Sequence, residues 1–129
     1  MFSEEQAVTV DADSTNILDL HAHGDDLQRN LTLFVQSRES VASDTPGATV
    51  TFELYTDDAL NAGGDDLAAD NLIWSSAAIP MASLADGDFA VKVPLPAGVQ
   101  RYLLLKYNVS ATLKAGKFDA GLAWGIDLP

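Results

Sequence analysis

The stretch that decides the fold is KFDAGLAWGI at residues 117–126, where apolar residues alternate with small or polar ones without a break. One face of this segment would carry Phe118, Ala120, Leu122, Trp124 and Ile126. A side-chain period of two over such a length is typical of a half-buried β-strand. We therefore predict a strand here, with its aromatic and leucine side chains in the core.

Other segments of the chain repeat this signal. Alternation is clear at 49–56, 88–93 and 101–109, the runs at 31–37 and 72–79 are more continuously apolar, and shorter candidates lie at 6–10 and 15–20. The predicted core comprises Phe52, Leu54, Phe89, Val91, Leu105, Phe118, Leu122 and Trp124. About eight short strands separated by Gly, Pro and Asp turns predict an all-β, antiparallel β-sandwich of jelly-roll or immunoglobulin type. Only residues 80–84 favour a helical turn.

The length of 129 residues corresponds to one domain, so we expect 1–129 to be a single sandwich. Residues 1–13 could form an N-terminal arm. Residues 57–71, DDALNAGGDDLAADN, combine five Asp with a Gly-Gly pair and no basic residue. This composition predicts a long acidic surface loop, which a compact domain keeps for function or leaves mobile.

The chain is strongly acidic, with 19 Asp and Glu against 7 Lys and Arg, a net charge of −12 and a pI near 4.1. Such a charge is repelled by phosphate backbones and by anionic membrane surfaces, so neither nucleic acid nor membrane is an expected partner. The charge is also uneven, since residues 39–91 contain ten acids and no Lys or Arg. The N-terminus has acids where a signal peptide needs a basic region.

No motif in the sequence predicts catalysis, a metal or a cofactor. Cysteine is absent, and both histidines lie in DLHAHGDD at 19–26, where His21, His23 and Asp25 reproduce only part of a metallo-β-lactamase signature. The loop at 11–16 begins like a calcium-binding EF-hand but lacks its glycine and its bidentate Glu. Nucleophile elbows and phosphate loops are also missing. We expect a non-enzymatic protein. The Asp pairs of the acidic loop leave open whether this loop binds a divalent cation.

Taken as an ordered series of segments, the chain resembles the jelly-roll capsid cement, or decoration, proteins of tailed bacteriophages. The segments that carry the likeness are 14–20, 31–36, 48–54, 78–80, 84–87, 93–96, 101–103, 107–109 and 115–118. The resemblance implies a jelly-roll sandwich that binds the outer surface of the major capsid protein shell, as a homodimer or homotrimer. It thus implies a virion protein on the outer capsid surface.

Two expectations concern how such a protein would bind. Lys114 and Lys117, near the Ala115-Gly116 turn, are the residues we expect to contact the capsid, with the acidic loop pointing to solvent. The alternative function is a carbohydrate-binding β-sandwich module, whose sugar-stacking candidates would be Trp74, Trp124, Tyr55, Tyr102 and Tyr107. A small metal-dependent enzyme built on the two histidines is a third, more remote alternative.

Overall fold

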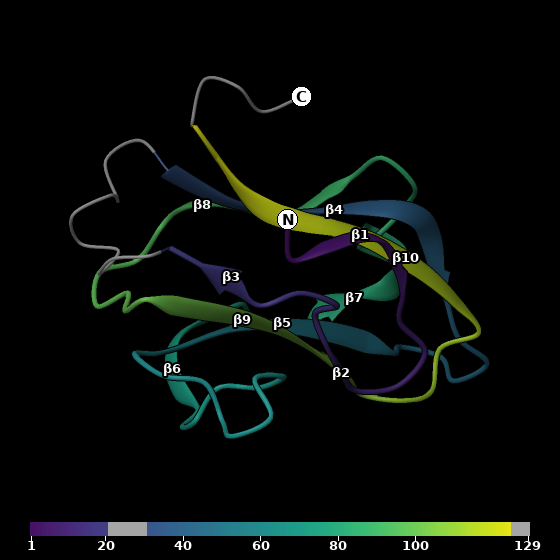
Figure 1. The fold of residues 1–129 in the computed structure, drawn as a ribbon. Helices are drawn as coiled ribbons and strands as arrows, with labels where there is room; N and C mark the ends of the chain where they lie inside the picture. Colours follow the sequence, from purple (N-terminus) through teal and green to yellow (C-terminus); the bar gives the residue numbers. More distant parts are fainter. Residues whose placement is uncertain (21–30, 125–129) are drawn as a thin grey trace.

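The computed structural model describes residues 1–20 and 31–124, and for Trp124 only the backbone. Two antiparallel sheets pack face to face as a sandwich (Figure 1). The four-stranded sheet contains, in spatial order, β1 (Ser3–Ala7), β10 (Ala115–Trp124), β4 (Leu31–Ala42) and β8 (Phe89–Pro94). The six-stranded sheet contains β2 (Ala12–Asp13), β9 (Tyr102–Val109), β5 (Thr49–Asp57) and β6 (Asn71–Ser75), with β3 (Leu18–Asp19) also beside β9 and β7 (Ile79–Pro80) also beside β5.

The strands follow the jelly-roll winding. β2 and β3 pair with successive parts of β9, and β6 and β7 do the same with β5, so ten short strands fill eight positions. Numbered along the chain, those positions give the orders 1-8-3-6 and 2-7-4-5 in the two sheets. Nearly every connection therefore crosses from one sheet to the other, as in a jelly roll. The predicted sandwich of about eight strands is confirmed.

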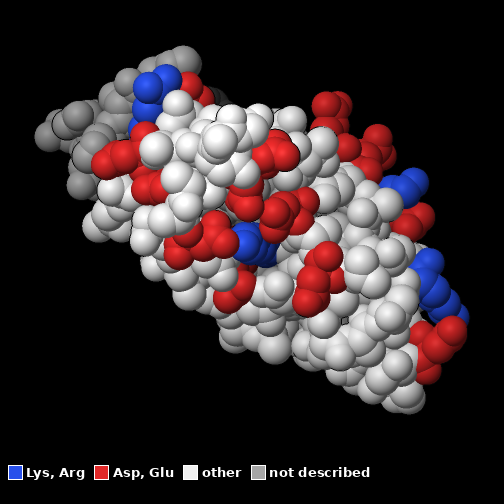
Figure 2. Space-filling view, turned by 60° about the horizontal axis from the view of Figure 1, so that its bottom comes forward, with Lys and Arg blue, Asp and Glu red and all other residues white. Residues whose placement is uncertain are grey.

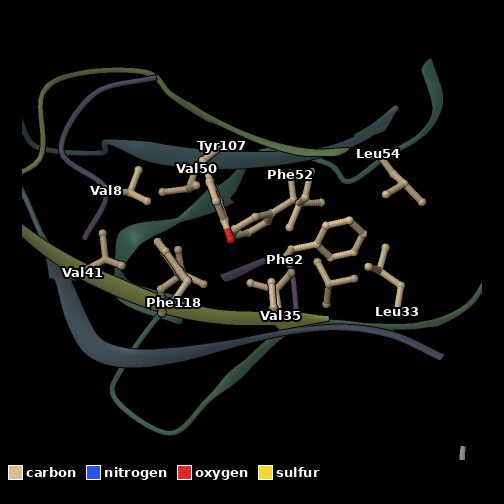
Figure 3. Packing of buried hydrophobic residues seen from close by; sticks show 14 of the residues in the cluster. Phe2, Val8, Leu33, Val35, Val41, Val50, Phe52, Leu54, Tyr107 and Phe118 are labelled. Carbon is tan, nitrogen blue, oxygen red and sulfur yellow. The ribbon is translucent and has the colours of Figure 1, made fainter. Parts of the chain in front are cut away.

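The core lies between the sheets and follows the alternation of the sequence. On β5, Val50, Phe52 and Leu54 are fully buried, and β9 contributes Leu103, Leu105 and Tyr107. Phe52, Tyr107 and Phe118 form an aromatic trio with ring centroids 5.4–5.7 Å apart (Figure 3). Burying each such side chain contributes about 1.5–3 kcal/mol, and aromatic pairing adds about 0.5–1.5 kcal/mol. Leu122 is half-buried against this core.

The N-terminal segment is part of the sandwich. Phe2 and Val8 are buried in the core, and β1 pairs with β10 along the edge of the four-stranded sheet. The Tyr107 hydroxyl donates a hydrogen bond of 2.7 Å to Ser3 Oγ, and the Ser3 hydroxyl in turn donates to Gln6 Oε1. A register shift between Ser3 and Gln6 interrupts the alternation, which explains why the sequence placed this strand at 6–10.

One predicted core position is wrong. In β8, Val91 is opposite Val35 of β4, but Phe89 is opposite Gln36, so Ala90 is an extra residue in the ladder. This β-bulge turns Phe89 to the outer face of the sheet, while Ala90 packs against the core instead. A strict period of two cannot reveal such an insertion. The side chain of Trp124, also predicted in the core, lies outside the described part of the structure.

Two remaining features complete the fold. The helical turn favoured at 80–84 is present as a 3₁₀ turn, η2 (Met81–Ser83). Within residues 1–20 and 31–124, no helix is long and apolar enough to cross a membrane.

Candidate functional site

Lys114 and Lys117, the predicted contact residues, lie at the same end of the sandwich. Lys114 sits in the connection from β9 to β10, with its Nζ 3.3 Å from Asp44 Oδ1, and both side chains are largely exposed. Lys117 is exposed at the start of β10, next to the inward-pointing Phe118. It therefore points from the outer face of the four-stranded sheet. An exposed pair such as that of Lys114 is worth only about 0–1 kcal/mol, so both lysines remain available to a partner's carboxylates.

The same outer face carries an apolar patch that the sequence did not indicate. Phe34 and Phe89 meet edge to face with their centroids 6.5 Å apart, and Lys92 Nζ lies 5.0 Å from the Phe89 ring centre. At Gly121 a Cβ atom would lie 3.3 Å from Met1 Cα and 3.4 Å from Phe34 Cε1, so glycine lets both residues rest on β10. We call Met1, Phe34 and Phe89 the aromatic patch. The unbroken apolar run around Phe34 could have indicated this patch, because consecutive apolar residues of a strand place apolar side chains on both faces of the sheet.

The acidic loop is a folded hairpin. An antiparallel bridge joins Leu60 to Leu67, supported by backbone hydrogen bonds from Asn61 N to Asp66 O and from Ala68 N to Ala59 O. Its tip turns at Gly64, whose φ of +72° suits glycine. We call residues 58–70 the acidic hairpin. Its order comes from local backbone pairing, which the sequence composition did not predict.

The acidic hairpin lies over the outer face of the six-stranded sheet. Leu104 points to this face, because its neighbours Leu103 and Leu105 are in the core, yet it is only 2% exposed. Leu67 is 5% exposed and also stands outside the main core. Asp70 pairs with Lys106, and Leu60, Gly64 and Asp65 line a cleft together with Tyr102, so the hairpin lies along β9 between Tyr102 and Lys106, where Leu104 is buried. Most of its Asp side chains are exposed.

Lys106 is the cation at the centre of this acidic face. Its Nζ lies 2.9 Å from Asp70 Oδ2 and 4.7 Å from the centre of the Tyr55 ring. The hydrogen bond to Asp70 raises the pKa of Lys106, against the effect of desolvation. The pKa of Asp13 is raised, mainly by burial and further by the charges of Asp66 and Asp70. The charge of Lys106 acts in the opposite direction. Figure 2 shows basic atoms surrounded by acidic side chains on this side of the molecule.

Two open clefts are lined in part by residues of β9. One, of about 350 Å³, is lined by Asp11, Ala12, Asp13, Lys106 and Asn108. The other, of about 370 Å³, is lined by Thr15, Asn16, Ile17, Asp19, Leu60, Gly64, Asp65 and Tyr102. Within the described residues no group of three or more His, Asp or Glu is arranged to hold a metal ion, the Asp pairs of the hairpin included. His21, His23 and Asp25 lie outside the described residues.

The aromatic residues considered for sugar stacking are dispersed. Tyr107 is fully buried in the core, and Trp74 is half-buried against it. Tyr55 carries Lys106 over its ring, and Tyr102 carries Arg101 with the guanidinium carbon 4.9 Å from the ring centre. Arg101 is itself held by two hydrogen bonds to Asp19, of 2.8 and 2.9 Å. Tyr55 and Tyr102 therefore each offer at most one ring face to a ligand.

Comparison with known proteins places the chain in a family. A search of curated proteins gave no match. The sequence profile of the Bbp16 family matches residues 2–122, from just before β1 almost to the end of β10. The matched region thus includes the described strands of both sheets except the last two residues of β10, and also the acidic hairpin and the aromatic patch apart from Met1. The chain therefore belongs to the Bbp16 family.

Proposed function

We propose that this protein is a non-enzymatic structural component of a tailed-phage virion, a cement protein that binds the outer surface of the major capsid protein shell and stabilises it. The jelly-roll order of the strands and the series of segments that resembles the decoration proteins support this proposal. The observation that carries it is the outer face of the four-stranded sheet, which holds the aromatic patch, Lys92 over the Phe89 ring, and Lys117 at the start of β10. Neither lysine makes an ion pair among the described residues.

The proposed attachment divides the work between apolar and charged groups. Aromatic side chains are enriched among the residues that dominate binding energy, so Phe34 and Phe89 would supply most of the affinity. Lys114 and Lys117 would then steer the protein toward acidic groups of the shell, since rim charges act mainly on the rate of encounter. The acidic hairpin, on the opposite sheet, would point to solvent. The proposal includes no nucleic-acid or membrane partner and no cofactor.

Self-association is a second part of the proposal. Within the part of the chain that the structure describes, β8 and β6 lie at edges of the two sheets, and open edges invite pairing unless they are protected. A homodimer or homotrimer on the particle would cover such edges by the closed symmetry usual for small oligomers. Native mass measurement of the free protein, and imaging of decorated particles, would show a monomer in both states if this part is wrong.

The test of shell binding is co-sedimentation with undecorated capsid shells. We expect the wild-type protein to pellet with the shells, and Phe34→Ser with Phe89→Ser to abolish pelleting while the variant remains folded. A matched control is Leu72→Ser, which changes a 51% exposed residue on the other sheet. The proposal is wrong if the wild-type protein stays in the supernatant at saturating concentrations, and the assigned face is wrong if only the control loses binding.

A further inference from the structure

Polar contacts tie the base of the acidic hairpin to the sandwich. Asp70 pairs with Lys106, Ala69 N donates to Asp57 Oδ2 at 2.7 Å, and Gln100 Nε2 donates to Asp58 Oδ2 at 3.3 Å. Among residues 58–70, Leu67 is the only one that is buried. Segments with few buried apolar contacts and exposed backbone hydrogen bonds open at lower free energy than the strands beneath them.

Electrostatics around the hairpin is unbalanced. Lys106 faces Asp70 from the hairpin and Asp13 from β2, and on β5 it faces Tyr55, whose hydroxyl donates to Glu53. The charge of Asp66 on the hairpin acts on Asp13. The raised pKa of Asp13 reflects burial and the charges of both hairpin carboxylates, which outweigh the lysine. Among the described residues, Lys106 is therefore the cation that offsets the mutual repulsion of these carboxylates from two elements. Removing its charge would leave that repulsion without this compensation.

We propose that the acidic hairpin is a lid that opens as a unit from the outer face of the six-stranded sheet, with Lys106 as its latch. Breaking the pair between Lys106 and Asp70 releases the lid and uncovers the apolar side chain of Leu104 on β9. This inference concerns the protein alone and does not rest on the proposed function.

The first test is hydrogen exchange of the hairpin amides in Lys106→Met, which keeps the side-chain stem over Tyr55 but removes the charge. We expect the amides of Asn61, Ala68 and Ala69 to exchange about three- to tenfold faster than in the wild-type protein. Lys114→Met is the matched control, because it removes the same charge from an exposed pair at the end of the sandwich. Its hairpin amides should exchange at the wild-type rate.

Added salt separates a latch from a packing role. Raising NaCl from about 10 mM to about 1 M shortens the Debye length from about 30 Å to about 3 Å and so screens the repulsion between carboxylates. We expect the hairpin of Lys106→Met to regain protection under these conditions. A loss caused by poorer packing of the methionine would be the same at both salt concentrations, and would contradict the proposal.

A thiol reports on the uncovered residue directly. The chain has no cysteine, so Leu104→Cys introduces one buried probe at the position beneath the lid. We expect native-state labelling of this thiol to be about three- to tenfold faster when Lys106→Met is added, and unchanged with Lys114→Met. The proposal is overturned if both backgrounds label alike, or if the hairpin amides exchange only at the rate of the amides of β5 and β9, which would mean that the lid opens only on global unfolding.

Discussion

The buried hydrogen bond between Tyr107 and Ser3 gives the sharpest test of how the N-terminal segment is held. Both residues are 0% exposed, and the bond spans 2.7 Å between β9 and β1. Tyr107→Phe removes the hydroxyl and should cost about 1 kcal/mol, the net worth of one such bond. Ser3→Ala instead leaves the buried tyrosine hydroxyl without its acceptor, and should cost more, about 1–3 kcal/mol.

The double variant distinguishes this reasoning from simple additivity. With both changes no hydroxyl is stranded, so the double variant should be less destabilised than the two single costs together, with a coupling of at least about 1 kcal/mol. The assay is urea unfolding with a common slope, from which differences in the free energy of unfolding follow. Costs that add within about 0.3 kcal/mol, or a Ser3→Ala cost below that of Tyr107→Phe, would refute the assigned donor and acceptor.

The same pair predicts a pH dependence. Burial raises the pKa of Tyr107 well above its usual value, against a smaller opposing effect of the hydrogen bond with Ser3. The folded state thus keeps this proton at pH values where the unfolded chain loses it, so stability is fully present below about pH 10 and falls as the pH rises further. Each pH unit above that point should cost the wild-type protein up to about 1.4 kcal/mol relative to Tyr107→Phe. Parallel stability curves of the two proteins up to pH 11 would contradict the assignment.

Three further changes probe the sandwich and its surfaces. Phe118→Ala, in the aromatic trio, should cost about 3–5 kcal/mol in urea unfolding, whereas Phe89→Ala on the outer face should cost less than about 2 kcal/mol; equal costs would mean that the β8 bulge is misplaced. Reversing Lys114 and Lys117 to Glu should weaken co-sedimentation with capsid shells, and more at low salt than at high salt; a salt-independent effect would exclude a charge contact. Replacing residues 58–70 with a short Gly-Ser linker should leave shell binding nearly intact, and loss of binding there with harmless lysine reversals would invert the proposed orientation.

Local alternation was enough to predict the class of fold and most of the core. In β5, β9 and β10 the side-chain period of two places one set of residues between the sheets, because successive side chains of a strand point to opposite faces. Phe52, Leu54, Leu105 and Phe118 therefore lie in the core, as the sequence predicted. The absence of cysteine and the net charge of −12 were likewise fixed by composition.

The surfaces depended on pairings between distant segments. Phe89 turned outward because β8 takes an extra residue against β4, and a bulge is set by the register between two strands instead of by one. Lys106 entered an acidic face only because β9 pairs with β5 and lies beside β2. The acidic loop is a hairpin because its backbone pairs across Leu60 and Leu67, and its place beside β9 depends on the pair between Asp70 and Lys106. Composition and periodicity thus determined what the chain would bury, whereas the long-range pairing of strands decided which side chains would meet on its surface, because contacts between distant segments leave no periodic trace in either one.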